Sequence, residues 1–587
     1  MALSLTLAVP LADLAVPEGA FAAVPDSTAT VPQLPTQGQI QSTLPSTPIA
    51  PELKSAPLTT TPPSTTNEIP SGGPTVTVTG FDISGNTVYP SATLQALLTD
   101  YVGKDLTLAG LYNAAAVITR YYQDHGYGIA RATVPQQTLQ GGRVKLQVLE
   151  GRIGKVTLDG KSHTRTGAIL GQATAIKSGD VYTDSAMERA ALLVNDLPGL
   201  QSQAVLSPGD EFGNADITYK LTEQPEYTGL VSVDDYGRPD IGRVRLSATA
   251  DVASPTDSGD RLSAYLLHSE DDLLNFGALT YSLPLGPAGG RLTASYDQTR
   301  YHVTGVFSPL HVAGTGKDGS LSYLYPQLRS RYENFYWGLG LQHESGATTV
   351  TVNEKVVDPK TNQKVDHSVT AEVSSNNLNL LQFTGYFSHS FEDGSAYDVT
   401  GVAASNGRHD DGNDPHAERF RLQVDAGYAL PFAQSWTFLS HGSSVWSPDP
   451  LSDTEKFSLG GPDNVRGYPS ADVRGDAGFY GSLELQRSLA PALPLSVGGF
   501  FDAGRTWSRH FDTPVIFVNT VTGAKTPGFS TTPPEVHTLE SVGAELIYQS
   551  SDKRWISRLE WAYAVGYAKP SDGNAGGHIW ATFGMNF

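Results

Sequence analysis

The 587-residue sequence contains no cysteine. This excludes a disulfide scaffold and thiolate-based metal or redox chemistry, and it is compatible with an oxidising compartment. Positive charge is also scarce, because 39 Lys and Arg stand against 60 Asp and Glu, which gives a formal net charge of -21. Binding to nucleic acid needs clustered Lys and Arg to neutralise phosphates. The composition therefore argues against a nucleic-acid partner.

Long apolar runs are missing after the first 22 residues. No later stretch reaches the ~18 uncharged apolar residues that a membrane-spanning helix requires, so only strands remain as a way to cross a bilayer. Residues 1–22 are apolar at first and end in Ala20-Phe21-Ala22, which is typical of a signal-peptide cleavage site. This segment has no Lys or Arg and contains Asp13 and Glu18. We therefore expect a secretory signal whose true start lies further upstream.

Common enzymatic motifs are absent as well. The sequence has no Walker loop, no HExxH and no GxSxG, and its 14 His are scattered. The cluster Gly407-Arg408-His409-Asp410-Asp411 is better interpreted as a solvated turn than as a metal site. We expect no catalytic residues, no cofactor and no metal.

Residues 23–74 form a separate segment rich in Pro, Thr and Ser. Such a composition cannot bury enough apolar surface to offset chain entropy. We expect a linker that is extended and partly polyproline-like.

Two consecutive units, residues 75–151 and 152–224, share the order strand, two helices and two strands. In the first unit, Ser91 is a candidate N-cap for a helix with apolar residues at helical spacing, and residues 143–151 alternate as a strand. In the second unit, Ser185-Ala186-Met187-Glu188 matches a capping box for a helix through Val194. The pattern predicts two small α+β domains.

From residue 225 to residue 587, helical spacing gives way to strict alternation of apolar and polar residues, as in residues 243–252 and 420–430. Strands of about 10 residues with apolar outer faces, joined by tight turns on one side and long polar loops on the other, are typical of an outer-membrane barrel. This length accommodates roughly fifteen to twenty such strands. We expect residues 344–376 and 407–418 to be the long exterior loops.

A Gly-rich segment of this region carries a single Arg near its tip: Leu459-Gly460-Gly461-Pro462-Asp463-Asn464-Val465-Arg466-Gly467-Tyr468. It is followed by the strand Phe500-Phe501-Asp502-Ala503-Gly504, in which Asp502 lies on the polar face. A guanidinium and a carboxylate pair bidentately, so the two residues would hold the loop if it folded inward. From these residues alone, a solvated turn beside an ordinary strand acid is the simpler interpretation.

GGPDNVRGY followed by FxDxG resembles the paired signature of outer-membrane transporters that carry POTRA domains. Residues 451–458 are similar to the branch devoted to two-partner secretion, of the haemolysin secretion/activation type, and residues 126–153 and 195–221 resemble its first and second POTRA domains. The resemblance implies an all-β transmembrane barrel of about 16 antiparallel strands preceded by two α+β POTRA domains. It places the barrel in the outer membrane of a Gram-negative bacterium and residues 23–224 in the periplasm.

The resemblance also implies a lumen latch, in which the VRGY loop enters the barrel and Arg466 meets Asp502. Its other residues are Val465, Gly467, Tyr468, Phe500 and Gly504. Residues 325–331 match a stretch that enters a barrel strand, so we expect Arg329 and Arg331 to line the lumen. Some members place an N-terminal helix in the barrel as a plug, but the prolines of residues 23–74 argue against a long helix here. The terminal Phe587, on the alternating strand 578–587, resembles the signal read by the barrel assembly machinery.

In function, the resemblance implies a translocator that secretes one large exoprotein, adhesin- or haemolysin-like, without ATP. The POTRA domains would capture the unfolded cargo by strand addition at exposed sheet edges. The expected partners are this exoprotein with its N-terminal secretion domain, outer-membrane lipid and the barrel assembly machinery.

Three alternatives remain open. A barrel-assembly factor of the same superfamily would share Arg466 and Asp502 but usually carries more POTRA units. A general porin would not need POTRA domains. A soluble β-rich binding protein would not place apolar residues on its outer faces or end in Phe587.

Overall fold

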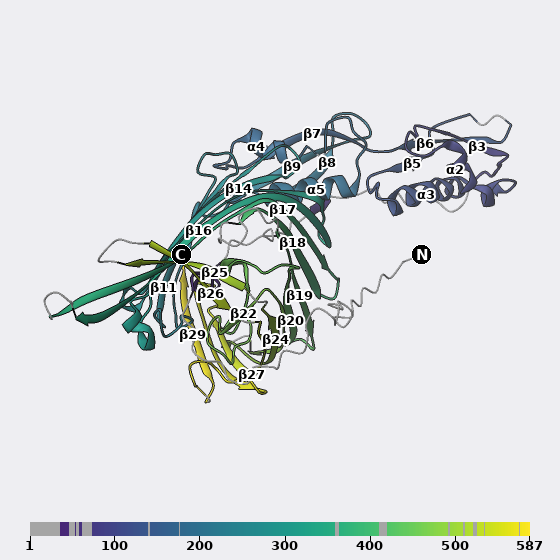
Figure 1. Ribbon diagram of the computed structural model, residues 1–587. Helices are drawn as coiled ribbons and strands as arrows, with labels where there is room; N and C mark the ends of the chain where they lie inside the picture. The colour runs from purple at the N-terminus through teal and green to yellow at the C-terminus, as the bar shows by residue number, and fades with distance from the viewer. Residues whose placement is uncertain are drawn as a thin grey trace.

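The structure, a computed structural model, shows two small α+β domains followed by a closed β-barrel (Figure 1). It describes residues 36–45, 53, 58–60, 73–138, 141–174, 176–357, 363–409, 419–490, 493–508, 511–519, 525–532, 534–574 and 576–587. The expected signal peptide, residues 1–22, lies outside this range. No helix in the described part of the chain is long and apolar enough to span a membrane.

The first domain packs helix α3 (Leu108–Asp124) against a small mixed sheet. The sheet has the order β3 (Gly80–Ser84), β6 (Arg143–Leu149), β5 (Arg131–Thr133), and β2 (Val76–Thr77) pairs with β4 (Asp105–Leu106) beside it. Leu111, Ile118 and Tyr122 of α3 lie on one face at helical spacing and are fully buried in the core. Helix α2 (Ser91–Ala96), which precedes η1 (Thr99–Tyr101), starts one residue earlier than expected, with Pro90 at the N-cap, so the Ser91 cap was wrong.

The second domain has helices α4 (Thr166–Gln172) and α5 (Asp184–Asn195) on a sheet of β7 (Arg152–Asp159), β9 (Asn214–Glu223) and β8 (Leu200–Pro208). The N-cap of α5 is Thr183, whose hydroxyl accepts from the Ala186 N–H, so the capping box at Ser185 was wrong. A short strand of the preceding segment, β1 (Leu58–Thr60), pairs in parallel with the outer edge of β8. This edge is therefore already occupied by the chain itself.

The barrel wall consists of sixteen antiparallel strands and is closed by pairing of the first, β10, with the last, β29. The wall strands are β10 Tyr227–Asp234, β11 Arg245–Ala253, β12 Arg261–Ser269, β13 Leu274–Pro284, β14 Arg291–His302, β15 Ala313–Arg329, β16 Glu333–Val357, β17 Lys364–Ser390, β18 Ala396–His409, β19 Arg419–Phe432, β20 Trp436–Trp446, β23 Ala477–Ala490, β24 Leu493–Trp507, β27 Val536–Gln549, β28 Trp555–Val565 and β29 His578–Asn586. Apolar residues such as Leu246, Tyr296 and Phe583 are about half exposed on the outer face, whereas the neighbouring Arg245 and Ser247 are buried. This alternation confirms the predicted barrel.

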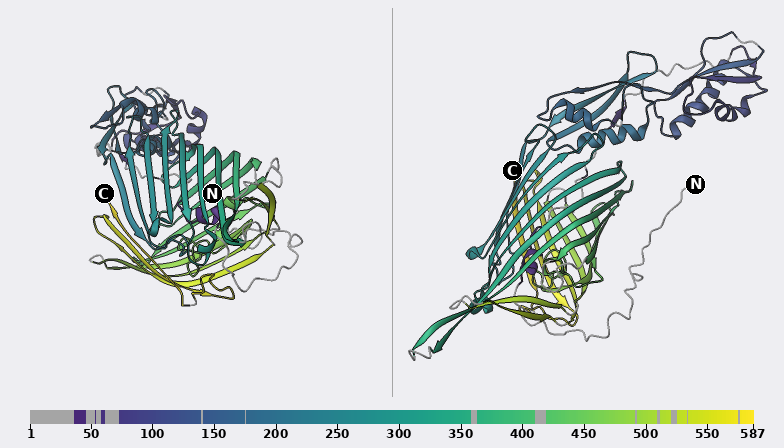
Figure 2. Two further views of the ribbon diagram at one scale, coloured as in Figure 1. Left: turned by 60° about the vertical axis from the view of Figure 1, so that its left-hand side comes forward. Right: turned by 45° about the horizontal axis from the view of Figure 1, so that its top comes forward.

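One end of the barrel faces the POTRA domains and the other faces the exterior (Figure 2). Because β10 follows directly from the second domain, the first turn, residues 235–244, lies at the opposite end of the barrel, and the even-numbered turns, beginning with residues 254–260, return to the POTRA side, which is the periplasmic side. At the exterior end, β16 and β17 continue their pairing as far as Val357 and Lys364 and project beyond the rim. The hairpin of β25 (Phe511–Asn519) and β26 (Lys525–Thr532) joins this extension through pairing with β17.

The exterior loops differ from the expectation. Residues 344–376 are mostly part of the β16–β17 hairpin and are not an irregular loop. Their polar character suggested a loop, but Thr348-Thr349-Val350-Thr351-Val352 is β-branched throughout and so favours a strand. Residues 407–409 belong to β18, and residues 410–418 lie outside the described part of the chain.

Candidate functional site

Residues 447–476, which connect β20 to β23, fold back into the barrel; we call them the lumen loop. The loop contains η4 (Asp453–Glu455) and a small hairpin of β21 (Phe457–Leu459) and β22 (Val473–Gly475). Its apolar side chains Leu459, Val465 and Tyr468 are fully buried and cluster with Leu539 of the inner wall. These side chains would be exposed to water if the loop pointed away from the barrel, whereas in the lumen they contact other apolar side chains. Their burial therefore favours the inward position of the loop.

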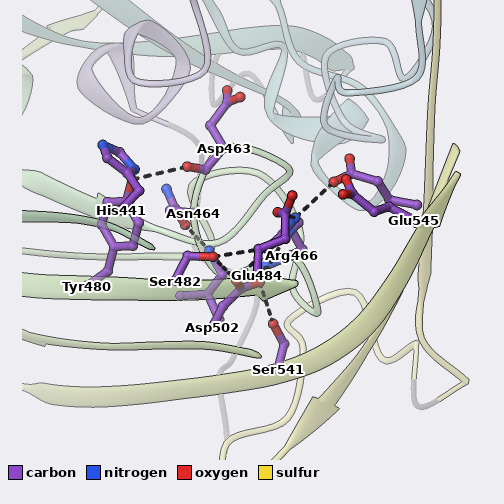
Figure 3. Close-up of polar contacts among 12 residues, drawn as sticks. His441, Asp463, Asn464, Arg466, Tyr480, Ser482, Glu484, Asp502, Ser541 and Glu545 are labelled. Carbon is purple, nitrogen blue, oxygen red and sulfur yellow. Dashed lines mark hydrogen bonds and ion pairs between the residues drawn. The ribbon is translucent and has the colours of Figure 1, made fainter. Parts of the chain in front are cut away.

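Arg466 lies at the tip of the lumen loop and forms a bidentate ion pair with Asp502 of β24 (Figure 3). Arg466 Nη2 is 2.8 Å from Asp502 Oδ1, and Arg466 Nε is 2.9 Å from Asp502 Oδ2. The backbone N–H of Arg466 also donates to Oδ2, at 3.2 Å. Asp502 is 0% exposed and Arg466 only 4%, so the pair is shielded from solvent.

Two hydroxyls from the flanking strands complete the surroundings of Asp502. Ser482 Oγ donates to Oδ1 at 2.7 Å, and Ser541 Oγ donates to Oδ2 at 3.0 Å. Asp502 therefore accepts bonds on both oxygens from three elements. A buried carboxylate with this many donors is held in one orientation.

Arg466 has two further acidic partners that the sequence did not reveal. Its Nη1 donates to Glu484 of β23 and to Glu560 of β28, both at 3.1 Å. Glu545 of β27 lies beyond them, 3.7 Å from Arg558, which is also 3.9 Å from Glu560. The cluster thus contains four carboxylates and two guanidinium groups. Glu484 is two residues from Ser482 on β23, so both side chains face the lumen. Listing the inward-facing positions of this strand would therefore have indicated Glu484 as a candidate.

The remaining residues expected in the lumen latch lie around this cluster. The guanidinium carbon of Arg466 sits 3.3 Å from the centre of the Phe500 ring, in the geometry of a cation–π contact. The Tyr468 hydroxyl donates to the carbonyl of Ala568 at 3.1 Å. Trp580, which the sequence did not single out, donates from Nε1 to the carbonyl of Arg466 at 2.8 Å.

Gly467 and Gly504 allow the loop and the wall to approach closely. A Cβ on Gly467 would lie 2.7 Å from Ser541 Cβ and 2.8 Å from the backbone N of Ala564. A Cβ on Gly504 would lie 2.9 Å from both Leu459 methyl carbons. Any side chain at residue 467 would therefore push the loop away from the wall.

A second set of contacts places residues 36–45 inside the barrel, where Figure 2 shows the short helix α1 (Gln37–Gln41). Asp453 accepts from the Thr36 hydroxyl at 2.8 Å and from the Gly38 N–H at 2.6 Å. Arg474 holds the same carboxylate through an ion pair. Ile40 is fully buried in an apolar cluster with residues of the wall.

This part of the chain corrects the expectation of a wholly periplasmic linker. Residues 36–45 are packed in the lumen, and the helix has only five residues, consistent with the proline content of the segment. A five-residue helix with one large apolar residue carries too weak a periodic signal to be recognised in the sequence.

The two Arg residues expected in the lumen instead join the barrel to the second POTRA domain. Arg329 donates to both carboxylate oxygens of Asp196, at 2.8 and 2.9 Å, and Arg331 Nε is 3.2 Å from Glu188. Arg189 of α5 donates to the carbonyl of Pro326 at 2.6 Å. The expectation that Arg329 and Arg331 line the lumen was wrong. Arg329 is the last residue of β15 and Arg331 lies in the periplasmic turn that follows, where strand alternation no longer decides between lumen and lipid.

The C-terminal residue, Phe587, extends the β10–β29 pairing that closes the barrel. Phe587 exchanges two backbone hydrogen bonds with Gly229 of β10, at 3.0 and 3.1 Å, and its side chain is 60% exposed on the outer face.

No group of three or more residues suited to a metal ion occurs in the described ranges.

Comparisons with known proteins agree with this architecture. A family model described as haemolysin secretion/activation protein ShlB/FhaC/HecB matches residues 213–525, and a POTRA domain model of ShlB type matches residues 76–151. The heme/hemopexin transporter protein HuxB of Haemophilus influenzae (strain 86-028NP) is 25% identical over 82% of this chain and 81% of its own length. The outer membrane transporter CdiB of Escherichia coli O6:K15:H31 (strain 536 / UPEC) is 27% identical over 74% of this chain and 73% of its own. The solved structure of CdiB from Escherichia coli superposes with a TM-score of 0.65 at 21% identity, covering 91% of this chain and 94% of that one, which shows a shared fold.

Proposed function

Because the chain belongs to the haemolysin secretion/activation family, whose members are outer-membrane transporters of two-partner secretion, we propose that it exports one large exoprotein through the lumen described above. The observation that supports this most directly is that the lumen contains two separately anchored parts. The loop tip is tied to the wall by Arg466, whereas residues 36–45 are tied to the loop through Asp453. Residues 36–45 also bond Ala471 of the loop and Arg245 of the wall, so their departure would break these contacts but leave the Arg466–Asp502 ion pair in place.

The two anchors differ in strength in a way that suits this division. The tip is held by a shielded bidentate ion pair with additional hydrogen bonds to Glu484 and Glu560. Residues 36–45 are held by a few hydrogen bonds and by burial of Ile40, worth ~1.5 to 3 kcal/mol for a side chain of this size. We therefore assign a permanent position to the loop tip and a removable one to α1.

On the periplasmic side, the cargo would be captured at the sheet edges of the POTRA domains. A peptide can add to an open strand edge through main-chain hydrogen bonds that make little sequence demand. In the second domain, the edge of β8 is filled by β1 over only three residue pairs, from Leu58↔Ala204 to Thr60↔Leu206. We propose that a cargo strand displaces β1 and that this frees the segment leading to α1. Export would draw on no nucleotide, and the cargo would present its N-terminal secretion domain to residues 75–224.

A reversible cross-link tests the removal of α1. The chain has no native cysteine, so the pair Thr36→Cys and Asp453→Cys reacts alone with a thiol-cleavable bifunctional reagent. We expect exoprotein secretion in cells to stop on cross-linking and to recover on cleavage, while each single variant treated with the reagent keeps secreting. Undiminished secretion by the fully cross-linked pair would show that α1 stays in place during export.

A further inference from the structure

A groove of about 880 Å³ opens on the outer wall of the barrel, over strands β11 to β14. It lies on the lipid-facing side, because its lining residues Leu246, Leu266 and Tyr296 are 50 to 63% exposed and alternate with the buried Leu267 and Ser247. The middle of the groove passes over Gly277, where the absence of a side chain leaves a notch beside Leu266. The floor of the groove is therefore apolar.

The rim of the groove toward the exterior is basic. Arg300, His302 and His268 line it, all exposed, beside one acid, Asp272, and Arg300 lies only two residues before the exterior end of β14. On the next strand, Lys317 is paired with Gln298 and faces outward as well. Arg300 and Lys317 are diagonal neighbours across β14 and β15, which puts their Cα atoms ~7 to 8 Å apart.

These two cations have no obvious partner within the chain. Among the residues that the structure describes, neither Arg300 nor Lys317 forms an ion pair. Asp272, the acid at the rim, already accepts from Asn275 Nδ2 at 2.6 Å and lies 3.8 Å from His268. The chain has a formal net charge of -21, yet these two cations face outward beside the apolar, lipid-facing wall. An anion from outside the chain would neutralise them.

We propose that this groove binds a phosphorylated glycolipid of the outer leaflet. An acyl chain lies over Gly277 between Leu266 and Tyr296, and a sugar phosphate sits between Arg300 and Lys317. Guanidinium and ammonium groups form short charge-assisted bonds with phosphate, and long basic side chains reach the headgroup level from an apolar wall. The amide groups of Asn275 and Gln298, on the same face, can bond to sugar hydroxyls. This site is independent of cargo export.

Native mass spectrometry of the full-length protein, with bisphosphorylated lipid A added, tests the site. The double variant Arg300→Gln/Lys317→Gln should bind about tenfold more weakly, since it loses two charge-assisted contacts. Gly277→Leu should weaken binding without changing charge, because it fills the notch. The matched control is Arg487→Gln, which removes an outward-facing Arg at the periplasmic end of β23, where Arg487 stacks on Trp436.

Comparison lipids decide the chemistry of the ligand. Dephosphorylated lipid A should bind to the wild type as weakly as bisphosphorylated lipid A binds to the double variant. Neither phosphatidylglycerol nor inorganic phosphate, at a concentration equal to that of lipid A, should displace lipid A from the wild type. The proposal fails if the double variant binds normally, if Arg487→Gln weakens binding equally, or if phosphatidylglycerol competes as well as lipid A. Heat-modifiable mobility in gel electrophoresis verifies that every variant is a folded barrel.

Discussion

Arg466 and Asp502 are 36 residues apart in the chain and meet through two parallel hydrogen bonds on the inner wall of the barrel, where Asp502 has no solvent exposure. The contact joins the tip of a 30-residue loop to the middle of a strand. It also brings Glu484 and Glu560 to the same guanidinium.

The first prediction concerns this pair. Arg466→Ala and Asp502→Ala should each leave the barrel inserted but impair secretion, because removing one partner of a fully shielded ion pair costs ~3 to 5 kcal/mol. The double variant should be little worse than Arg466→Ala alone, since that change already removes the Asp502 contact together with those to Glu484 and Glu560. Arg466→Lys should not restore full secretion, because an ammonium cannot form the bidentate contact. The measurement is exoprotein secreted per inserted barrel, and strictly additive losses would show that the residues act independently.

The second prediction tests the close approach of the loop to the wall. Gly467→Ala should lower secretion and destabilise the loop position by ~1 to 3 kcal/mol, because the new methyl group would overlap Ser541 Cβ and the backbone of Ala564. Gly481→Ala is the matched control, since its Cβ would meet nothing within 4 Å. Protease accessibility of the lumen loop in intact cells would report its displacement. Equal secretion and equal protection in both variants would contradict the proposed packing.

The third prediction concerns the joint between the barrel and the second POTRA domain. Arg329 is 3% exposed and bidentate with Asp196, whereas the Arg331 and Glu188 side chains are partly solvated. Arg329→Gln should therefore loosen the domain strongly, and Arg331→Gln only slightly, since exposed pairs contribute ~0 to 1 kcal/mol. Hydrogen exchange of α5 in the full-length protein measures this difference. Similar exchange in both variants would show that other contacts hold the domain to the barrel, for example the hydrogen bond from Arg189 to the Pro326 carbonyl.

The fourth prediction concerns the pH dependence of the first POTRA domain. Burial raises the pKa of Glu150, but this effect is outweighed by hydrogen bonds from the Thr87 hydroxyl, the N–H groups of Val88 and Thr87, and the Tyr122 hydroxyl, so the pKa lies below its ordinary value. A lowered folded-state pKa means that the charged Glu150 stabilises the domain above its unfolded-state pKa of ~4.3 and loses this contribution as the pH falls through the folded-state value.

Glu150→Gln should therefore lower the melting temperature of a fragment of residues 73–224 at pH 7, and the difference from wild type should shrink below about pH 4. Glu211→Gln, a change on an exposed residue of the second domain, is the control. A difference that stays constant from pH 7 to pH 3 would show that Glu150 acts by its shape and not by its charge.

The residue patterns alone determined the class of this protein. Strict alternation from residue 225 predicted a barrel with apolar outer faces, and two strand-and-helix units predicted the preceding α+β domains; both are confirmed. The barrel could be predicted from local periodicity, because each wall strand has one face toward lipid and one toward the lumen. Its residues must therefore alternate between apolar and polar, and this alternation is visible in the sequence.

The tertiary structure alone decided which distant residues meet. Glu484, Glu560 and Trp580 come to Arg466 because closure of the barrel brings β23, β28 and β29 around one loop, and no spacing within a strand encodes this. The same holds for Arg329, which contacts Asp196 at the domain joint, and for residues 36–45, which lie in the lumen because Asp453 and an apolar wall receive them there. Alternation specifies the face on which a side chain lies, whereas its partner depends on strand register and loop path, which only the closed barrel establishes.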